Sequence, residues 1–525
     1  MPEYLAPGVY IEEIARGPTP IEGVSTSTAA FLGQTERGPV MPRFVTSYNQ
    51  YVRLFGDLFG SAQYMPHAVS SFFENGGRRC YVCRIASLTA KSGAVDYPHA
   101  QITAQGPGLW SDRLCIKIGA GTTVRKGGPA ASVRIQVAYW REGNLPATAL
   151  KNDDVAADPF KSGSTLLPRP DMVETFDDVD LVDPTSPDHF SKRVSGNSTL
   201  IDMLAPDAVS ADPIELELTL FSGGAEGAAV TVADYCNDTE ADVRKWQGLQ
   251  ALLLDQYRDV ALVYAPHTPG DAAQTIAKKV IAHCEKQRFR FAVVDAFPGK
   301  GNVSDATLDP RTTLADSKYG AVYYPWITVA EPGTGARKSI PPGGAVLGIY
   351  ARTDSERGVF KAPANETVRG ALDLEYNIDE RSQELLNPRS VNVIRQFPGR
   401  GIRVWGARTL SSEALWKYVS VRRLFIFLEA SIFEGTQWVV FEPNDERLWA
   451  RVKDTIRLFL RAQHRLGALM GATEAEAFQI TCDRTTMTQD DILNGRLICT
   501  IGIAPVRPAE FVVFRIFQST SEAQT

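Results

Sequence analysis

The feature that most constrains the fold is an alternation of apolar and amphipathic segments between residues 260 and 296. Residues 260–265 are a continuous apolar run of strand length, and residues 289–296 are a second, mostly apolar one. Residues 272–287 lie between them and have helical periodicity, with one apolar face made of Ile276, Val280, Ile281 and Cys284. A strand, a helix and a strand at this spacing predict a βαβ unit and therefore a parallel sheet.

Other apolar runs predict further strands and helices. Residues 28–33 and 79–85 have the pattern of buried strands, and residues 47–59 between them have that of a helix. In the second half of the chain the pattern predicts strands at 319–329, 497–503 and 510–518. It also predicts helices at 245–258, 416–434 and 445–467, and a short helix at 490–493. Asn444 is the expected N-cap of the helix at 445–467. We therefore expect a multidomain chain of the α/β and α+β classes.

Residues 96–234 differ in texture from the sequence on either side. Strand candidates at 114–118, 133–139 and 216–221 alternate with stretches rich in Asp, Pro, Ser and Gly. We interpret this segment as an inserted, mostly-β outer domain. The expected division is an N-terminal extended arm at 1–25, an α/β middle domain at 26–95 plus 235–385, the insert at 96–234, a mixed α+β C-terminal domain at 386–504 and a C-terminal arm strand at 505–525.

Composition excludes several classes of protein. With 525 residues, 44% hydrophobic and 22% charged, the chain is neither disordered nor collagen-like nor a coiled coil. A net charge of -6 gives no global attraction to nucleic acid or anionic lipid. No apolar run approaches the about 20 residues of a membrane span, and the start MPEYLAPGVYIEEI lacks the pattern of a signal peptide. We expect no direct nucleic-acid binding, no membrane insertion and a protein that is made and folded in a cytoplasm.

Motifs for catalysis or cofactor binding are incomplete. Cys80 and Cys83 form a CxxC without a second pair, and the seven cysteines are too sparse and odd in number for a disulfide framework. GTGARKS at 333–339 lacks the P-loop glycines, and FPGRGIRVWG at 397–406 lacks the third glycine of the dinucleotide fingerprint. Both are better interpreted as turns. We expect no enzyme, no cofactor and no metal site, against the rival of an α/β hydrolase-type or nucleotide-using enzyme.

Two features do suggest binding surfaces. In a helix at 445–467, Leu448, Val452, Ile456, Phe459 and Leu466 share one side. The opposite side carries an arginine stripe, interrupted only by Asp454 and made of Arg447, Arg451, Arg457, Arg461 and Arg465, with Lys453 flanking. Such a stripe is either a solvated face or a contact for an acidic partner. In addition, the strand candidates at 9–14 and 510–518 lie at the chain ends without an obvious partner, which favours strand exchange between subunits.

Long blocks of the sequence resemble contractile tail sheath proteins. They include YLAPGVYIEEI, FLGQTERGP and LFGD near the start, and PPGGAVLGIYARTDSERGVFKAPAN, LLNPRSVNVIRQFPGRGIRVWGARTL, WKYVSVRRLFIFLEASIFEGTQWVVFEPNDERLW and GRLICTIGIAPVRPAEFVVFRI later. The similarity covers 319–518 almost continuously and resumes in 4–85, whereas the insert contributes only GLWSDRLCIKI. A single chain of this kind argues against the type VI system, but phage tail, bacteriocin and injection system stay open.

The resemblance implies a structural subunit that polymerises as stacked hexameric rings around an inner tube and contracts to drive the tube through a target envelope. The implied partners are further copies of the chain, the inner tube protein, and baseplate and terminal cap proteins. The implied particle is a phage tail or phage tail-like particle that assembles in a bacterial or host-cell cytoplasm, with extracellular release as one option. The alternative is a non-contractile capsid- or adhesin-like protein, with the insert as its binding module. The implied inter-subunit strands are Val9, Tyr10, Ile11, Glu12, Glu13 and Ile14, and Phe511, Val512, Val513, Phe514, Arg515, Ile516 and Phe517. The implied linkers contain Pro18, Pro20 and Gly23 at one end and Pro505 and Pro508 at the other. The implied tube-facing residues are the five arginines of the stripe, on an inner C-terminal domain.

Overall fold

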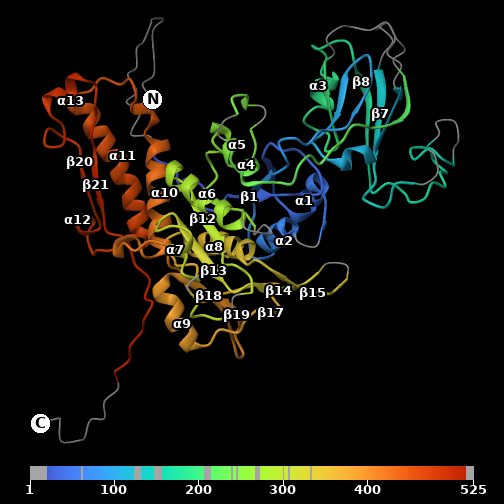
Figure 1. Cartoon of the computed structure of the whole chain (residues 1–525). Helices are drawn as coiled ribbons and strands as arrows, with labels where there is room; N and C mark the ends of the chain where they lie inside the picture. The colour runs from blue at the N-terminus through green and yellow to red at the C-terminus, as the bar shows by residue number, and fades with distance from the viewer. Residues whose placement is uncertain are drawn as a thin grey trace, which may run out of the picture. The chain divides into compact units, whose positions relative to one another are not determined.

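The computed structural model describes residues 20–515 except 61–62, 123–131, 147–149, 151–155, 206–214, 238–239, 244–245, 267–271, 300, 306–307 and 332–333. Contacts within the chain divide it into two compact units (Figure 1). We call them the sheet unit, Thr26–Glu356 with Pro363–Lys417, and the helix unit, Met1–Ser25 with Arg357–Ala362 and Tyr418–Thr525. Each is described by itself.

A nine-stranded sheet forms the centre of the sheet unit, in the order β16-β19-β18-β13-β12-β11-β1-β3-β2. The strands from β18 through β3 pair in parallel, and β19, β16 and β2 are antiparallel additions at the edges. The strands are β1 Ala29–Gly33, β2 Arg43–Val45, β3 Cys80–Arg84, β11 Leu262–Tyr264, β12 Phe291–Asp295, β13 Gly320–Tyr324, β16 Glu366–Thr367, β18 Val391–Phe397 and β19 Gly401–Val404. The predicted βαβ unit is confirmed, because helix α6 (Ala272–Gln287) connects the paired strands β11 and β12.

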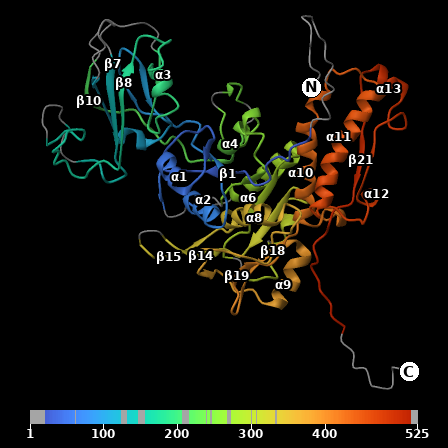
Figure 2. The same ribbon diagram turned by 180° about the vertical axis from the view of Figure 1, so that it is seen from behind.

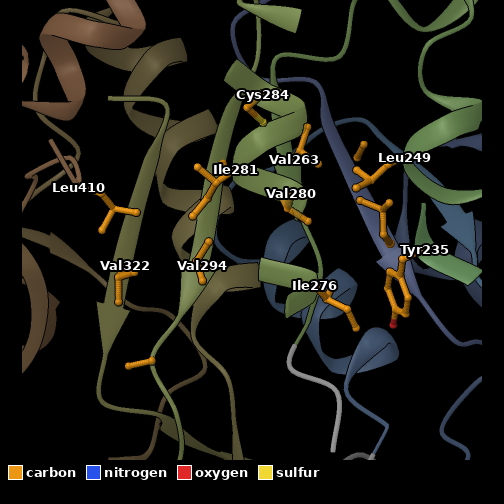
Figure 3. Packing of buried hydrophobic residues seen from close by; sticks show 14 of the residues in the cluster. Tyr235, Leu249, Val263, Ile276, Val280, Ile281, Cys284, Val294, Val322 and Leu410 are labelled. Carbon is orange, nitrogen blue, oxygen red and sulfur yellow. The ribbon is translucent and has the colours of Figure 1, made fainter. Parts of the chain in front are cut away.

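Helices cover both faces of this sheet. On one face, the predicted apolar side of α6 packs over Val263, Val294 and Val322, together with Tyr235 and Leu249 from short helices (Figure 3). On the other face, Phe31 contacts Phe72 of α2, and the hydroxyl groups of Tyr323 and Tyr350, the latter in α8, lie 2.6 Å apart. The helices of the unit are α1 Tyr48–Phe55, α2 Met65–Glu74, α3 Phe190–Arg193, α4 Val232–Tyr235, α5 Gly248–Ala251, α6, α7 Pro310–Thr313, α8 Gly343–Arg357 (its last residue lies in the helix unit) and α9 Glu380–Leu386, with short 3-10 turns between them.

The β-rich segment that we expected as an insert has a hydrophobic core of its own, made of residues between Val95 and Phe221. The segment contains a four-stranded antiparallel sheet, β10-β6-β7-β8 (Figure 2), and a three-stranded sheet, β4-β5-β9. Their strands are β4 Ala94–Val95, β5 Gln101–Ala104, β6 Leu114–Ala120, β7 Ser132–Tyr139, β8 Met172–Asp180, β9 Ile201–Leu204 and β10 Leu216–Leu220. The three predicted strands correspond to β6, β7 and β10.

Two local predictions in the sheet unit are wrong. The strand expected at 319–329 is two strands, because the chain leaves β13 at Pro325 and enters β14 (Ile327–Ala330), which pairs with β15 (Arg337–Ile340) and β17 (Asp373–Leu374) in a separate sheet. The helix expected at 245–258 is only α5 followed by a 3-10 turn at Asp255–Tyr257. Gly248 has φ +56 and lies against the carbonyl oxygen of Tyr235, so the chain turns sharply there.

The expected boundary between residues 385 and 386 differs from the division in the structure. Strand β18 pairs in parallel with β13, and β19 returns beside β18 as a hairpin. Residues 363–417 therefore belong to the sheet unit, and the C-terminal part of the helix unit begins at Tyr418. The turn of this hairpin contains Gly399 and Gly401 at positive φ, which is why two glycines here form a turn and not a phosphate loop.

Two long helices and a small sheet make up the helix unit. The elements are α10 Val419–Gly435, α11 Glu446–Arg465, α12 Glu474–Ala477, β20 Phe478–Thr481, α13 Gln489–Leu493 and β21 Thr500–Ile503. The core between them contains Leu424, Leu428, Val452, Ile456 and Phe459. Across the ranges that the structure describes, no helix is long and apolar enough to cross a membrane.

Candidate assembly surfaces

Helix α11 starts one residue later than the sequence suggested. Its N-cap is Asp445, whose Oδ1 accepts a hydrogen bond of 2.8 Å from the backbone N–H of Leu448. Asn444, the predicted cap, is used differently. Its Oδ1 accepts from the indole N–H of Trp449 at 2.8 Å, and its Nδ2 donates to the carbonyl oxygen of Arg496 at 3.2 Å. The carboxylate is the better cap here because it is negative at the positive end of the helix.

The apolar side of α11 is buried almost as predicted. Leu448, Val452, Ile456 and Phe459 are each at most 5% exposed and belong to the core of the helix unit. Leu466 is the exception, with 66% of its surface exposed. The helix ends at Arg465. Leu466 is its C-cap residue and lies beyond the turns whose apolar side is buried.

The opposite side of α11 carries the arginines, which we call the arginine face (Arg447, Arg451, Arg457, Arg461 and Arg465). Four of these side chains are exposed and Arg461 is half-buried. Arg461 pairs with Glu474 through contacts of 2.5 and 3.1 Å, and this hydrogen bonding holds the pKa of the Glu474 carboxyl below its usual range. Arg457 lies 3.8 Å from Asp454, and Arg451 lies 3.9 Å from Glu442.

The arginine face can therefore change partners at little cost. Exposed ion pairs contribute only about 0–1 kcal/mol each, because water and salt screen them. Within the part of the chain that the structure describes, no carboxylate lies within 4 Å of the guanidinium of Arg447 or Arg465. A face with two such arginines and three weakly engaged ones suits a reversible contact with an acidic surface.

The structure describes part of the C-terminal segment expected to pair between subunits, but not the N-terminal one. Val9–Ile14, Ile516 and Phe517 lie outside the described residues. Residues 510–515 are described and form no strand, against the expected strand at 510–518. Phe511, Val512, Val513 and Phe514 are 72%, 67%, 77% and 84% exposed. Four consecutive exposed apolar residues are costly in water, and no described strand of this chain pairs with them.

A candidate acceptor lies in the same unit. Strands β20 and β21 form an antiparallel pair in which Phe478 faces Ile503 and Thr481 faces Thr500. Among the described residues no third strand joins either edge of this pair. A two-stranded sheet is marginally stable alone, and its free edges can template further strands.

The linkers expected beside the arms are shorter than the sequence suggested. Ile21 is 8% exposed and belongs to the core of the helix unit, and the backbone N–H of Val24 donates to Ser431 Oγ at 3.1 Å. A Cβ on Gly23 would lie 3.0 Å from the ring of Phe427, so Gly23 is packed and not a hinge. Pro505 is likewise held, because it bridges to Leu469.

The cysteine pair has the surroundings expected of structural residues. Cys80 and Cys83 are both fully buried in β3, and burial raises the pKa of both thiols. Across the described residues, no group of three or more His, Cys, Asp or Glu side chains is arranged to hold a metal ion.

Two family models and several known proteins match this chain. The phage tail sheath protein central domain matches residues 228–410, and the phage tail sheath C-terminal domain matches residues 411–519, so the two cover more than half of the chain. A prophage major tail sheath protein of Pseudomonas aeruginosa is 27% identical over 277 residues, which are 51% of this chain and 68% of that protein.

Solved structures resemble the whole chain. The helical sheath of the anti-feeding prophage in its contracted state has a TM-score of 0.58 and 24% identity, covering 98% of this chain and 99% of that one. The sheath of the PVC extracellular contractile injection system, also contracted, has a TM-score of 0.58 and 22% identity over 99% and 100% of the two chains. At these identities the likeness establishes a shared mixed α/β fold.

Proposed function

This chain belongs to the phage tail sheath protein family, and from that premise we propose that it polymerises as stacked hexameric rings around an inner tube in a metastable extended state. On a signal from the baseplate the sheath shortens and widens, and the tube is driven through a target envelope. The energy is stored during assembly as a difference between two packings of the same subunit, so no nucleotide is consumed. Further partners are the baseplate and a terminal cap, and the particle assembles in the cytoplasm of the producing cell.

The observation that carries the proposal is a mismatch within the helix unit. The chain exposes four consecutive apolar residues, 511–514, that have no strand partner among the described residues. The same unit contains the β20–β21 pair, whose edges are open among those residues. In a polymer each copy's terminal segment adds as a strand to this pair in a neighbouring copy, and the N-terminal segment at 9–14 adds in the same way. Backbone hydrogen bonds and apolar side chains are then satisfied between copies.

Strand addition also explains how contacts survive a large movement. The hydrogen bonds of an added strand persist through a rigid-body displacement if a short linker absorbs the motion. The packing of Ile21 and Val24 supports a first linker before residue 21, a stretch that contains Pro18 and Pro20 in the sequence. The backbone N–H of Val506 donates to the Ala468 carbonyl at 3.2 Å, which supports a second linker after Val506 that includes Pro508.

The arginine face of α11 is the proposed contact with the tube. Its charge is suited to an acidic tube surface, and its exposed ion pairs are weak enough to be released during contraction. A contact made mainly by burying an apolar face would instead hold the sheath on the tube at every salt concentration. The proposal therefore predicts tube binding that weakens as salt is raised.

Electron microscopy of the purified chain with and without its inner tube protein tests this function. We expect hollow striated cylinders for the full-length chain, and a soluble folded monomer after deletion of residues 507–525 or 1–20. A matched control is deletion of 519–525 alone, which leaves 511–517 intact and is expected to preserve cylinders. Normal cylinders from both long deletions would refute strand exchange, and a chain that forms none under any condition would refute the polymer.

A further inference from the structure

The turn between α10 and α11 places a phenylalanine where glycine is the usual residue. Phe441 has φ +70, in the left-handed region that bulky side chains rarely adopt. Val440 before it has φ -66 and ψ 129, and the backbone N–H of Glu442 donates to the carbonyl oxygen of Val439 at 3.2 Å. These values are those of a type II turn, whose third position favours glycine or asparagine.

Among the described residues, the Phe441 side chain buries no surface that would offset the cost of this backbone conformation. Phe441 is 102% exposed and Val440 is 60% exposed. Left-handed non-glycine residues persist where the surroundings hold them, and they gather at contact sites and switches. A fully exposed aromatic ring on a strained turn therefore points to a contact outside the chain.

The base of the turn is fixed to the structure. Trp438 and Val439 pack against the core of the helix unit, and Gln437 Nε2 donates to the carbonyl oxygen of Phe433 at 3.0 Å. The guanidinium carbon of Arg451 lies 4.6 Å from the centre of the Trp438 ring, and Arg451 also pairs with Glu442. The two exposed apolar side chains are thus presented by a rigid support.

This support connects the turn to the arginine face, because Arg451 belongs to both. An acidic partner surface that meets α11 along Arg447 and Arg451 also reaches the turn. Charge attraction acts over a distance and tolerates sliding, whereas an apolar side chain in a matching socket fixes position at short range. The two features therefore complement each other in one contact.

Resting on the function proposed above, we propose that Phe441 with Val440 is an apolar anchor that docks into an apolar socket on the inner tube protein, beside the acidic surface met by the arginine face. The arginines attract the tube, and the anchor sets the register of the subunit on it. Contraction then requires the anchor to leave its socket.

The test uses the full-length chain and preassembled inner tubes in a co-sedimentation assay. Phe441→Gly removes the anchor and gives the turn its favoured residue. We expect about 10- to 100-fold weaker tube binding together with a melting temperature raised by about 1–3 °C. Leu493→Gly, at a 77% exposed site in the same unit, is the matched control and is expected to leave tube binding unchanged.

Each outcome decides the matter. Tube binding of Phe441→Gly within twofold of the unmodified chain overturns the anchor. Loss of cylinder formation in the absence of tubes also overturns it and assigns the turn to a contact between copies. If Arg447→Glu with Arg465→Glu abolishes tube binding and Phe441→Gly does not, only the anchor fails. If the unmodified chain does not bind tubes at all, the proposed tube contact fails with it.

Discussion

Replacing Asp295 by Asn is expected to remove a pH-dependent weakness from the sheet unit. Asp295 ends β12, where its Oδ2 accepts from the hydroxyl of Tyr264 at 2.6 Å and its Oδ1 accepts from the backbone N–H of Gly343, the first residue of α8, at 2.9 Å. Burial raises the pKa of this carboxyl to about 7, although both hydrogen bonds act in the opposite direction. The charged form is therefore the unfavourable one in the folded chain.

The sign of the effect follows from proton binding. The unfolded carboxyl has a pKa of 3.8, so between that value and about 7 the folded chain binds more protons than the unfolded chain. Stability from this group is fully present at low pH and decreases as pH rises through this window. The whole shift corresponds to roughly 4 kcal/mol, of which about 2–3 kcal/mol falls between pH 5 and pH 8. Asparagine has no such dependence, and its amide can accept from Gly343 and donate to Tyr264.

Urea unfolding at pH 5 and pH 8 measures this difference, with the chain that lacks residues 507–525, which we expect to be monomeric. We expect the free energy of unfolding of Asp295→Asn, relative to the unmodified chain, to be about 2–3 kcal/mol more favourable at pH 8 than at pH 5. Asp379→Asn is the control that lacks this dependence. Asp379 caps α9, and the hydrogen bonding from Ser382 lowers its pKa below the usual 3.8, so the carboxyl is charged at both pH 5 and pH 8 and its stabilising contribution is lost only as pH falls below this range. Equal effects of Asp295→Asn at both pH values would refute the reasoning.

Three further predictions concern α8, the arginine face and the α11 cap. Gly343→Ala places a Cβ against the ring of Tyr264 and is expected to destabilise the chain by about 2–4 kcal/mol in the same urea assay, whereas Ala at Gly119, which has open space and no positive φ, would cost far less. Arg447→Glu with Arg465→Glu is expected to weaken tube binding at least tenfold at low salt without lowering the melting temperature, since neither arginine has an ion pair to lose among the described residues; unchanged binding would remove the arginine face from the contact. Asp445→Ala is expected to cost about 1 kcal/mol of unfolding free energy, and Asn444→Ala serves as the comparison that tells capping from general loop effects.

The parts of the fold that the sequence predicted are those where one local signal decides the structure. The apolar face of α6 and the runs on either side of it leave no alternative to a buried parallel pair, and α11 buries Val452 and Ile456 as its periodicity requires. The resemblance to sheath proteins added the family, which the comparisons confirm.

The failures depend on contacts that are distant in sequence. No local signal shows that β18 pairs with β13 across the long segment that separates them. The sequence therefore predicts a domain boundary at 385/386, whereas contacts put residues 363–417 in the sheet unit. The periodicity of residues 245–258 is helical, but the turn at Gly248 interrupts it. The exposure of single side chains could not be predicted either. Phe441 has the residue type of a core position, but its side chain lies fully in solvent. The strand roles of residues 9–14 and 511–517 stay predictions, since a partner copy would have to supply the pairing.

The nine-stranded sheet ends in β16 and β2, which are two and three residues long. Edges so short offer almost no backbone for another chain to pair with. In the polymer that we propose, these two edges therefore take little part in strand addition, which is assigned to the small β20–β21 pair. The proposed links between neighbouring subunits then do not depend on the β-rich module between residues 94 and 221, which has a hydrophobic core of its own and can vary in length and sequence without altering them.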